Sequence, residues 1–314
     1  MDEQKFNELK EKVVNNDLDH VIGQTKVKNQ LKSAVISNRH VIIVGPPGIG
    51  KTTLAKNLTD LLPKIEDDDG NTVKAPFVRI QGSPELTTED LIGDIDPLKA
   101  LEYGPMSIEA FTPGKIFKAD KGILFFDEVN RCTEKLQNSL LQVLEEGSVT
   151  IGSYDVDIPS DFLLIGTMNP EESATEPLSD VFLDRFDIIY MEAPSRYTYE
   201  EEIVLSKGKK MCDFPEDLLK RTIEYIRDLR HSKDLEKHPS VRATIGIYER
   251  SQSNAIVAGR TKVTGDDVED ALISVLSHRI RLKPSLKYVQ NTSEYIREEF
   301  QKFEDNQGKT RGGP

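Results

Sequence analysis

The segment that most limits the fold is GPPGIGKT at residues 45–52, which lies between the apolar run HVIIV (residues 40–44) and the helix-forming run TLAKNLTDLL (residues 53–62). A glycine-rich loop that joins a strand to a helix and ends in Lys-Thr is typical of a phosphate-binding loop. Its glycines let backbone N–H groups turn inward around a phosphate at the positive end of the helix. Lys51 can reach the β- and γ-phosphate oxygens, and Thr52 can hold Mg²⁺. An ordinary Gly/Pro turn with a solvated lysine does not need Lys-Thr directly after its last glycine. The residues predicted to surround the nucleotide are Gly45, Pro46, Pro47, Gly48, Ile49, Gly50, Lys51, Thr52 and Thr53.

A phosphate-binding loop needs a partner carboxylate on a neighbouring strand, and GILFFDE (residues 122–128) supplies one. Four apolar residues predict a buried strand, and two acids follow at its C-terminal end. Asp127 is predicted to hold Mg²⁺ through its water shell, and Glu128 to orient and partly deprotonate the water that attacks the γ-phosphate. The alternative is that the two acids only cap the next helix. Together with the loop, they favour ATP hydrolysis.

Between residues 40 and 191, short apolar runs bounded by Gly, Pro and Asp alternate with amphipathic stretches. This pattern predicts an α/β domain with a five-stranded, mostly parallel sheet. The strands are predicted at His40–Val44, Phe77–Gln81, Ile123–Phe126, Phe162–Thr167 and Ile188–Met191. The alternating VTIGSYDVDI (residues 149–158) predicts a β-hairpin that turns near Ser153 and Tyr154.

After Pro194 the strand signals stop, and a smaller all-α domain is predicted. Its helical stretches are 199–211, 215–231, 240–258 and 264–279, the second opening at Pro215 and the fourth just after Thr264 as N-cap. We expect an N-terminal helix in residues 1–19, a nucleotide-binding domain over 20–194, a helical domain over 195–284, and a C-terminal helix with a disordered tail over 285–314.

Composition restricts the function. A net charge of −13 opposes non-specific binding of nucleic acid. No apolar run is long enough to span a membrane, and the polar start MDEQKFNELK is unlike a secretory signal, so a cytoplasmic protein without membrane insertion is expected. Cys132 and Cys212 are expected to be reduced thiols, and the five histidines lack metal-ligand spacing.

With the loop and the acidic pair in place, the chain resembles an AAA+ ATPase of the branch that contains MoxR-type ATPases and the ATPase subunit of magnesium chelatase. The resemblance covers roughly residues 18–283 and makes the helical domain a lid. The stretch from Gly82 to Lys121 looks like the helix-2 insertion of this branch. FDEVNR (residues 126–131) is similar to its DEINR and DEVN signatures, and the VTIGSYDVDI hairpin has the position of the hairpin before sensor 1.

The resemblance also implies further site residues. Val21 and Ile22 in VIGQ match the segment that packs on adenine, although they could be a plain apolar turn. Asn169 matches sensor 1, which helps position the attacking water; the alternative is a simple turn formed with Pro170.

Two arginines are implied as well. Arg185 in FLDRF matches an arginine finger that acts on the neighbouring subunit's nucleotide. Its alternative is an ion pair with Asp184 or Asp187, and Arg131 is a rival finger. Arg242 in PSVRA matches sensor 2, although Val241 replaces the usual Pro, and a solvated or packing arginine is the alternative.

The resemblance therefore implies Mg²⁺-dependent ATP hydrolysis by a homo-oligomeric ring, expected to be a hexamer. A partner with a von Willebrand factor A domain would couple it to client remodelling or to metal insertion into a tetrapyrrole. One alternative is a nucleic-acid motor or loader, which is disfavoured because the hairpin carries Asp155 and Asp157 and no Lys or Arg. Another is a regulatory subunit that hydrolyses ATP poorly. The client is not indicated by the sequence.

Overall fold

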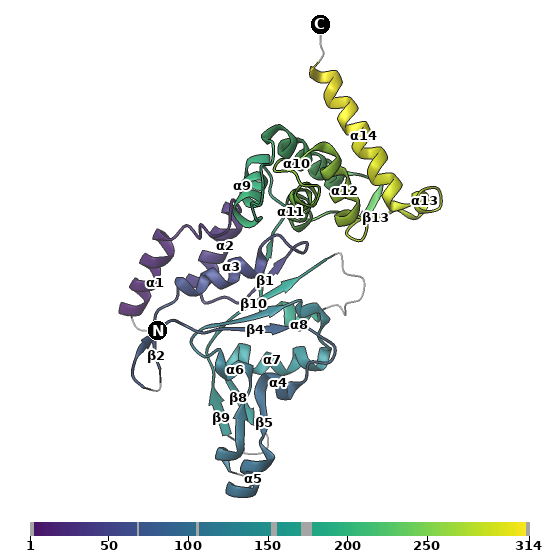
Figure 1. Cartoon of the computed structure of the whole chain (residues 1–314). Coiled ribbons are helices and arrows are strands. Elements are labelled where there is room, and N and C mark those ends of the chain that lie inside the picture. Colours follow the sequence, from purple (N-terminus) through teal and green to yellow (C-terminus); the bar gives the residue numbers. More distant parts are fainter. Residues whose placement is uncertain (1–2, 68, 105–106, 152–155, 171–177, 312–314) are drawn as a thin grey trace. The chain divides into compact units, whose positions relative to one another are not determined.

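The computed structural model describes residues 3–67, 69–104, 107–151, 156–170 and 178–311 (Figure 1). The chain forms two compact units. The first contains Met1–Gly45 and Gly50–Met191, and the second contains Pro46–Ile49 and Glu192–Pro314. Each unit is described by itself.

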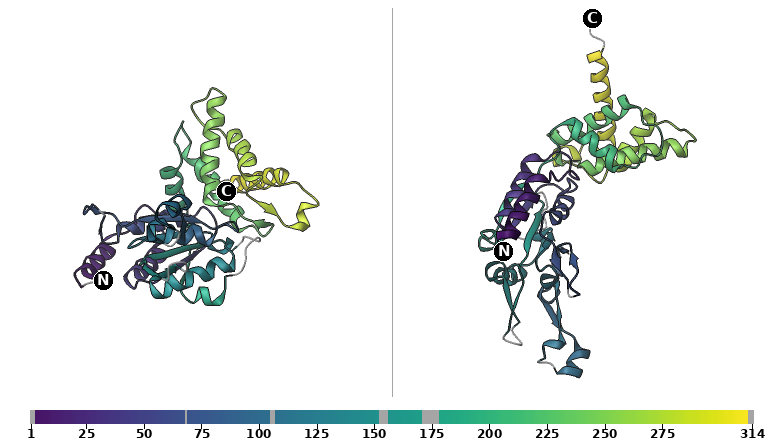
Figure 2. Two further views of the ribbon diagram at one scale, coloured as in Figure 1. Left: turned by 90° about the horizontal axis from the view of Figure 1, so that it is seen from below. Right: turned by 90° about the vertical axis from the view of Figure 1, so that its left-hand side faces the viewer.

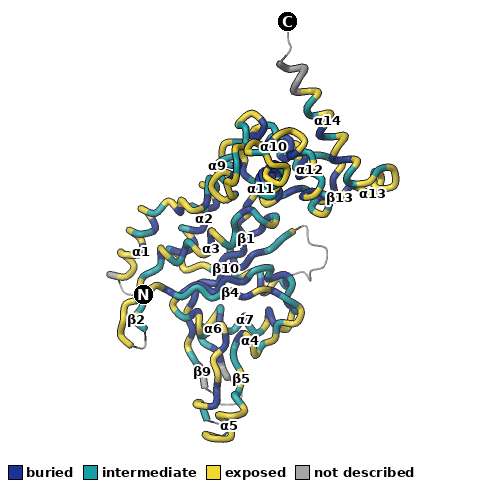
Figure 3. Tube along the Cα trace, viewed as in Figure 1, coloured by how far each residue is buried: buried dark blue, intermediate teal, exposed yellow. Residues whose placement is uncertain are grey.

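The first unit is built on a five-stranded parallel sheet with strand order β11-β1-β10-β7-β4. The strands are β1 (Val41–Val44), β4 (Phe77–Gln81), β7 (Ile123–Asp127), β10 (Leu163–Met168) and β11 (Asp187–Tyr190). All five predicted strands are confirmed, two of them with one end and two with both ends shifted by one residue. The inner strands β1, β10 and β7 are buried along almost their whole length (Figure 3), which explains their continuous apolar sequences.

Helices cover both faces of this sheet (Figure 1). The helices of this unit are α1 (Glu3–Asn15), α2 (Thr25–Ile36), α3 (Lys51–Asn57), α4 (Thr88–Ile92), α6 (Lys115–Lys118), α7 (Glu134–Glu146) and α8 (Asp180–Leu183), together with α5 (Pro97–Tyr103), which lies away from the sheet, and short 3₁₀ turns η1 (Leu58–Asp60), η2 (Ile108–Ala110) and η3 (Val129–Arg131). Alternate strand residues such as Ile42, Leu124 and Phe126 share one core with Leu140 of α7 and Phe182 of α8. Because side chains alternate along a strand, the residues between them face the opposite helices.

Three hairpins extend from this unit. They are β2–β3 (Ile65–Glu66 and Thr72–Val73), β5–β6 (Gly93–Ile95 and Phe111–Pro113) and β8–β9 (Ser148–Ile151 and Val156–Pro159). The hairpin predicted over residues 149–158 is confirmed as β8–β9, although its predicted turn at Ser153 and Tyr154 lies outside the described residues. The stretch 82–121 forms α4, β5, α5, η2, β6 and α6, and α5 lies at its tip with no buried residue (Figures 1 and 3).

The second unit is mainly helical. Its helices are α9 (Tyr197–Lys207), α10 (Glu216–His231), α11 (Val241–Val257), α12 (Gly265–Leu276), α13 (Pro284–Lys287) and α14 (Thr292–Arg311). The N-cap predicted at Thr264 is confirmed, because Asp267 accepts a hydrogen bond from Thr264 N at 2.9 Å in a capping box. The predicted helical domain is confirmed, with one correction to its all-α character. Two very short strands, β12 (Leu235–Lys237) and β13 (Arg281–Leu282), pair antiparallel.

The last helix, α14, packs against the unit through residues up to Glu304. Tyr295, Ile296 and Phe300 are buried in the helical core, and Glu304 pairs with Arg221 at 2.7 Å. The helix then continues away from the unit to Arg311 (Figures 1 and 2), where the sequence predicts a disordered tail. Residues 312–314 lie outside the described part. None of the described helices combines the length and apolar composition that a membrane crossing requires.

Candidate functional site

The glycine-rich loop follows β1 and leads into α3. Gly48 and Gly50 have φ angles of +79° and +101°, a left-handed backbone that favours glycine. Lys51 begins α3, and its Nζ donates a hydrogen bond back to the Gly45 carbonyl. Thr52 is half-buried and Thr53 is exposed. The loop therefore has the backbone that its sequence requires, with the lysine amine folded over it.

The strand register brings the loop and the polar strand ends to one edge of the sheet. Val44 of β1 pairs with Met168 of β10, and Gly45 N donates to the Met168 carbonyl at 3.0 Å. Asn169 is the next residue and is half-buried. On the other side of β10 lies β7, which ends at Asp127. This is the carboxyl edge of a parallel sheet, where ligands bind in open α/β folds.

Asp127 is held from both neighbouring strands. Thr167 Oγ1 on β10 donates to Asp127 Oδ1 at 2.6 Å. Arg79 on β4 donates from NH2 to Asp127 Oδ2 at 2.7 Å. Thr167 is fully buried, whereas the Arg79 side chain is 54% exposed. The carboxylate orientation is thus fixed by one buried hydroxyl and one exposed guanidinium.

Glu128 departs from the strand with a left-handed backbone, φ 55° and ψ 51°. A non-glycine residue in this region is strained, and such strain is commonly found at functional sites. Its backbone N donates to Thr167 Oγ1 at 2.9 Å, and its Oε2 accepts from Gln81 Nε2 at 2.8 Å. Arg131 Nε lies 3.1 Å from the same Oε2. The carboxylate is therefore turned out of the strand and held by polar partners.

Gly82 allows β4 to end against this backbone. A Cβ at Gly82 would lie 2.1 Å from the Glu128 carbonyl oxygen, so only glycine fits. Its backbone N donates to the Asp127 carbonyl at 2.7 Å. The close approach brings the end of β4, with Gln81, next to the acidic pair.

Three residues of this network, Arg79, Gln81 and Thr167, were not predicted from the sequence. Arg79 and Gln81 are alternate residues of FVRIQ, and in a strand alternate residues share a face. Thr167 is a polar residue in the buried strand β10, two positions before Asn169. These polar positions in apolar strands were the signals that could have found them.

The structure gives Arg185 partners within its own chain. The guanidinium forms ion pairs with Glu145 of α7 and, at 3.1 Å, with Asp184. Asp187, the other partner considered in the sequence, pairs instead with Arg39 at 3.1 Å. Arg185 Nε is buried without a hydrogen-bond partner among the described residues. A role on a neighbouring subunit would require the ion pair with Glu145 to open.

The remaining predicted residues are Arg242, Val21 and Ile22. Arg242 is exposed in the first turn of α11, in the unit that also contains Pro46–Ile49. A Cβ at Gly48 would lie 2.8 Å from Arg242 Cδ, so this side chain lies against the loop. Val21 is buried and Ile22 is half-buried just before α2.

The donor atoms at the sheet edge suit Mg²⁺. Thr52 and Asp127 offer a hydroxyl and a carboxylate, and Mg²⁺ prefers such oxygen ligands together with substrate phosphates. α3 packs against β7, which brings the elements of both residues together. Within the described parts of the chain, no three His, Cys, Asp or Glu residues cluster as a metal site.

The second unit contains a different carboxylate cluster around Glu200 of α9. Glu200 accepts hydrogen bonds from Arg227 at 3.2 Å, from Arg230 at 2.9 Å through both oxygens, and from Thr244 at 2.7 Å. Glu200 is fully buried. Burial alone would raise its pKa, but the hydrogen bonds and charges of Arg230, with those of Thr244 and Arg227, outweigh burial and lower the pKa. This cluster ties α9, α10 and α11 together.

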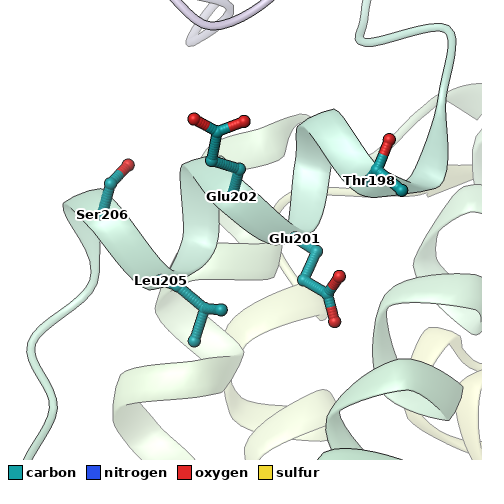
Figure 4. Close-up of a pocket in the computed structure, with 5 residues that line it drawn as sticks. All are labelled: Thr198, Glu201, Glu202, Leu205 and Ser206. Carbon is teal, nitrogen blue, oxygen red and sulfur yellow. The ribbon is translucent and has the colours of Figure 1, made fainter.

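A shallow hollow also lies along α9 (Figure 4). Its lining residues are Thr198, Glu201, Glu202, Leu205 and Ser206. The Tyr197 hydroxyl donates to Glu201 at 2.7 Å. None of the site residues predicted from the sequence lines this hollow, so we assign it no part in the site.

The parallel sheet, the glycine-rich loop after β1, the acidic pair after β7 and the helical second unit define the chain as a member of the AAA+ ATPase class. Comparison with known proteins narrows this class. The chain belongs to the family described as magnesium chelatase, subunit ChlI, whose model matches residues 17–180. A model described as AAA lid domain matches residues 227–299. The resemblance stated from the sequence is confirmed.

Individual relatives agree with this assignment. The magnesium-chelatase subunit ChlI homolog of Methanocaldococcus jannaschii is 31% identical over 317 residues, covering 84% of this chain and 85% of that protein. The uncharacterized protein YeaC of Bacillus subtilis is 25% identical over 293 residues and covers 85% of each chain. The solved structure of NtrX from Brucella abortus in complex with ADP superposes with a TM-score of 0.54 at 19% identity, covering 94% of this chain and 64% of that chain, which shows a shared fold.

Proposed function

We propose that this chain hydrolyses ATP with Mg²⁺ and works as an AAA+ motor in a ring of identical subunits. One observation carries the proposal. The acidic pair Asp127 and Glu128 stands at the sheet edge where β1 opens into the phosphate-binding loop, and Glu128 is turned out of its strand by a left-handed backbone. A nucleotide-binding domain without chemistry has no need of this second, strained carboxylate.

The loop residues Gly45–Thr53 would cradle the phosphates with their backbone N–H groups, and Lys51 would exchange the Gly45 carbonyl for phosphate oxygens. Thr52 and Asp127 would hold Mg²⁺. When bound, Mg²⁺ supplies positive charge that offsets the charge on the transferring phosphoryl group. Val21 and Ile22 would pack on the adenine.

Glu128 would act as the base that orients and partly deprotonates the attacking water, and Asn169 would help to position that water. In the present arrangement Glu128 Oε2 is engaged by Gln81 and Arg131. Activation of water therefore requires that these contacts loosen or that Glu128 acts through its other oxygen.

Arg185 and Arg242 would stabilise charge on the phosphoryl group, Arg185 from the neighbouring subunit and Arg242 within the chain. Arg131 is the rival for the role in trans. A hexamer is the expected ring. A lid over residues 195–284 is the corresponding domain proposal.

The family and the relative named as a magnesium-chelatase subunit favour a motor that acts for a partner protein. We propose a partner with a von Willebrand factor A domain, and either metal insertion into a tetrapyrrole or remodelling of a client, as in MoxR-type systems. A nucleic-acid motor is the alternative. A cytoplasmic location stays a prediction from the sequence.

The proposal is tested by ATP turnover as a function of protein concentration, for the wild type and for an equimolar mixture of Lys51→Ala with Arg185→Ala. We expect each variant to be inactive alone and the mixture to recover part of the activity, because one subunit's arginine serves the other's intact loop. Arg39→Ala, which removes a different ion-paired arginine of the same unit, is the matched control and should stay active.

A mixture that stays inactive although both variants fold and assemble together would exclude Arg185 as a finger in trans. The same mixture with Arg131→Ala would then test the rival. A wild type that turns over no ATP at any concentration would contradict the proposed hydrolysis itself.

A further inference from the structure

One carboxylate oxygen of Asp127 has a neutral, buried hydrogen-bond partner, and the other has a charged, exposed partner. On one side, the fully buried Thr167 hydroxyl donates its single hydrogen to Oδ1 at 2.6 Å. On the other side, the Arg79 guanidinium donates to Oδ2 at 2.7 Å. Both contacts cross from the neighbouring strands, β10 and β4, so they depend on the strand order rather than on the local sequence.

Thr167 is fully engaged by the acidic pair. Besides donating to Asp127, its Oγ1 accepts from the Glu128 backbone N at 2.9 Å. A single hydroxyl therefore sets the direction of the Asp127 carboxylate and fixes the backbone from which the Glu128 carboxylate projects. A neutral, buried donor of this kind stays compatible with a cation on the carboxylate, as partners of metal ligands usually are.

Arg79, in contrast, should oppose the binding of a cation. Its positively charged guanidinium contacts the same carboxylate that would hold Mg²⁺, and like charges a few ångströms apart repel. Its side chain lies on the edge strand β4 and is 54% exposed, so it is free to turn toward solvent. A second acceptor, Gln81 Oε1, lies 3.3 Å from its NH2.

We propose that Thr167 is a positioning residue for the metal-holding carboxylate, and that Arg79 is a counter-ion that occupies this carboxylate until Mg²⁺ displaces it. The inference rests on the proposed function, because it takes Mg²⁺ with ATP as the occupant of the site. It assigns opposite effects to two side chains on one carboxylate. Thr167 favours metal binding and Arg79 opposes it.

The test is the coupling between Mg²⁺ and nucleotide, measured as the ratio of the dissociation constants of a fluorescent ATP analogue in EDTA and in MgCl₂. We expect Thr167→Val to lower this ratio about 10-fold, the usual scale for loss of a partner of a metal ligand. Thr167→Ser keeps the hydroxyl and should give the same ratio as the wild type. Arg79→Gln should raise it about 3- to 5-fold, because an exposed charge acts weakly through solvent.

The matched control is Arg39→Gln. Arg39 is also an arginine with a 53% exposed side chain in an ion pair to a sheet aspartate, here Asp187 of the other edge strand β11. Its removal changes the net charge equally and should leave the ratio unchanged. An equal rise in both arginine variants would mean that only total charge matters, and would overturn the role of Arg79.

Other outcomes separate this inference from the proposed function. If Lys51→Ala abolishes binding of the analogue but Arg79→Gln leaves the coupling unchanged or lowers it, the counter-ion role is wrong and the proposed function stands. If Thr167→Val folds and keeps the wild-type ratio, the positioning role is wrong. Should Thr167→Val not fold, Thr167→Ala removes the same hydroxyl and decides the positioning role by the same ratio, while Arg79→Gln, which changes an exposed side chain, decides the counter-ion role. If the wild type does not bind the analogue, both proposals fail.

Discussion

The two units of this protein each contain a carboxylate cluster, and the two clusters are built in opposite ways. In the second unit Glu200 is fully buried and accepts four hydrogen bonds, three of them from two arginines. In the first unit Asp127 and Glu128 are half-buried, and each is engaged by an arginine whose side chain is considerably exposed, 54% for Arg79 and 39% for Arg131.

The difference separates a structural carboxylate, Glu200, from carboxylates with a proposed catalytic role, Asp127 and Glu128. Each oxygen of Glu200 already accepts two hydrogen bonds, and these bonds join three helices. We therefore assign this carboxylate a structural role. The arginine partners of the acidic pair are considerably exposed, and the second acid of the pair has a strained left-handed backbone. Exposure of the charged partners and backbone strain therefore distinguish the proposed functional carboxylates from the structural one better than the mere presence of an ion pair.

The largest expected effect is on catalysis. Glu128→Gln keeps the shape and the contact with Gln81 but removes the base, and we expect ATP turnover to fall about 10²- to 10⁴-fold. The free energy of unfolding should change by less than about 1 kcal/mol, since the partners of Glu128 are partly solvated. Turnover and urea unfolding on the same preparation check both parts. A strongly destabilised Glu128→Gln protein would mean that the pair is structural after all.

Glu200→Gln should show the reverse. The substitution leaves Arg227 and Arg230, whose side chains are only 19% and 12% exposed, without their counter-charge. We expect the free energy of unfolding to fall by about 3 to 5 kcal/mol. Glu236→Gln is the control, because Glu236 lies in an exposed pair 3.8 Å from Arg281, and should change stability by less than about 1 kcal/mol.

The pH dependence should also differ between the units. In the first unit, burial lowers the pKa of His40, so the folded chain resists protonation there. Its contribution to stability is complete above about pH 6.5 and is lost as the pH falls through the lowered pKa. In the second unit the pKa values of Glu200 and Asp267 are lowered, Asp267 mainly by hydrogen bonds from Arg260, so their contributions are lost only below about pH 4.

Hydrogen exchange measured by mass spectrometry at pH 7.5 and 5.5 can resolve the two units. We expect protection, corrected for intrinsic exchange rates, to fall in the first unit and to stay constant in the second. His40→Asn keeps an acceptor for the Leu164 N–H and removes the titration, so it should flatten the change. Equal loss of protection in both units in the wild type would contradict the assignment to His40.

The smallest expected effect is on the exposed pair of Arg39 and Asp187. Both side chains are about half exposed, at 53% and 47%, and such pairs contribute between about 0 and 1 kcal/mol. Arg39→Gln should therefore leave the melting temperature almost unchanged at high salt. A loss comparable with that of Glu200→Gln would show that exposure does not separate the two kinds of pair.

The sequence predicted the sheet well because its inner strands are continuous apolar runs bounded by Gly, Pro and Asp. The strands β12 and β13, of three and two residues, were missed because segments this short have no periodic pattern. The glycine-rich loop and the acidic pair were predictable because their residues are adjacent in sequence.

The contacts of Arg79 and Thr167 with Asp127 were not predictable from the sequence, because they depend on which strands neighbour β7. The pairing of Arg185 with Glu145 depends in the same way on the packing of α7.

The left-handed backbone at Glu128 bears on how this position can vary. Gly, Asn and Asp adopt that conformation more readily than Glu, so a substitution library screened only for the amount of folded protein should be enriched in them at position 128. A library screened for ATP turnover should retain Glu instead. A glutamate that persists at such a position marks selection for chemistry against the intrinsic preference of the chain.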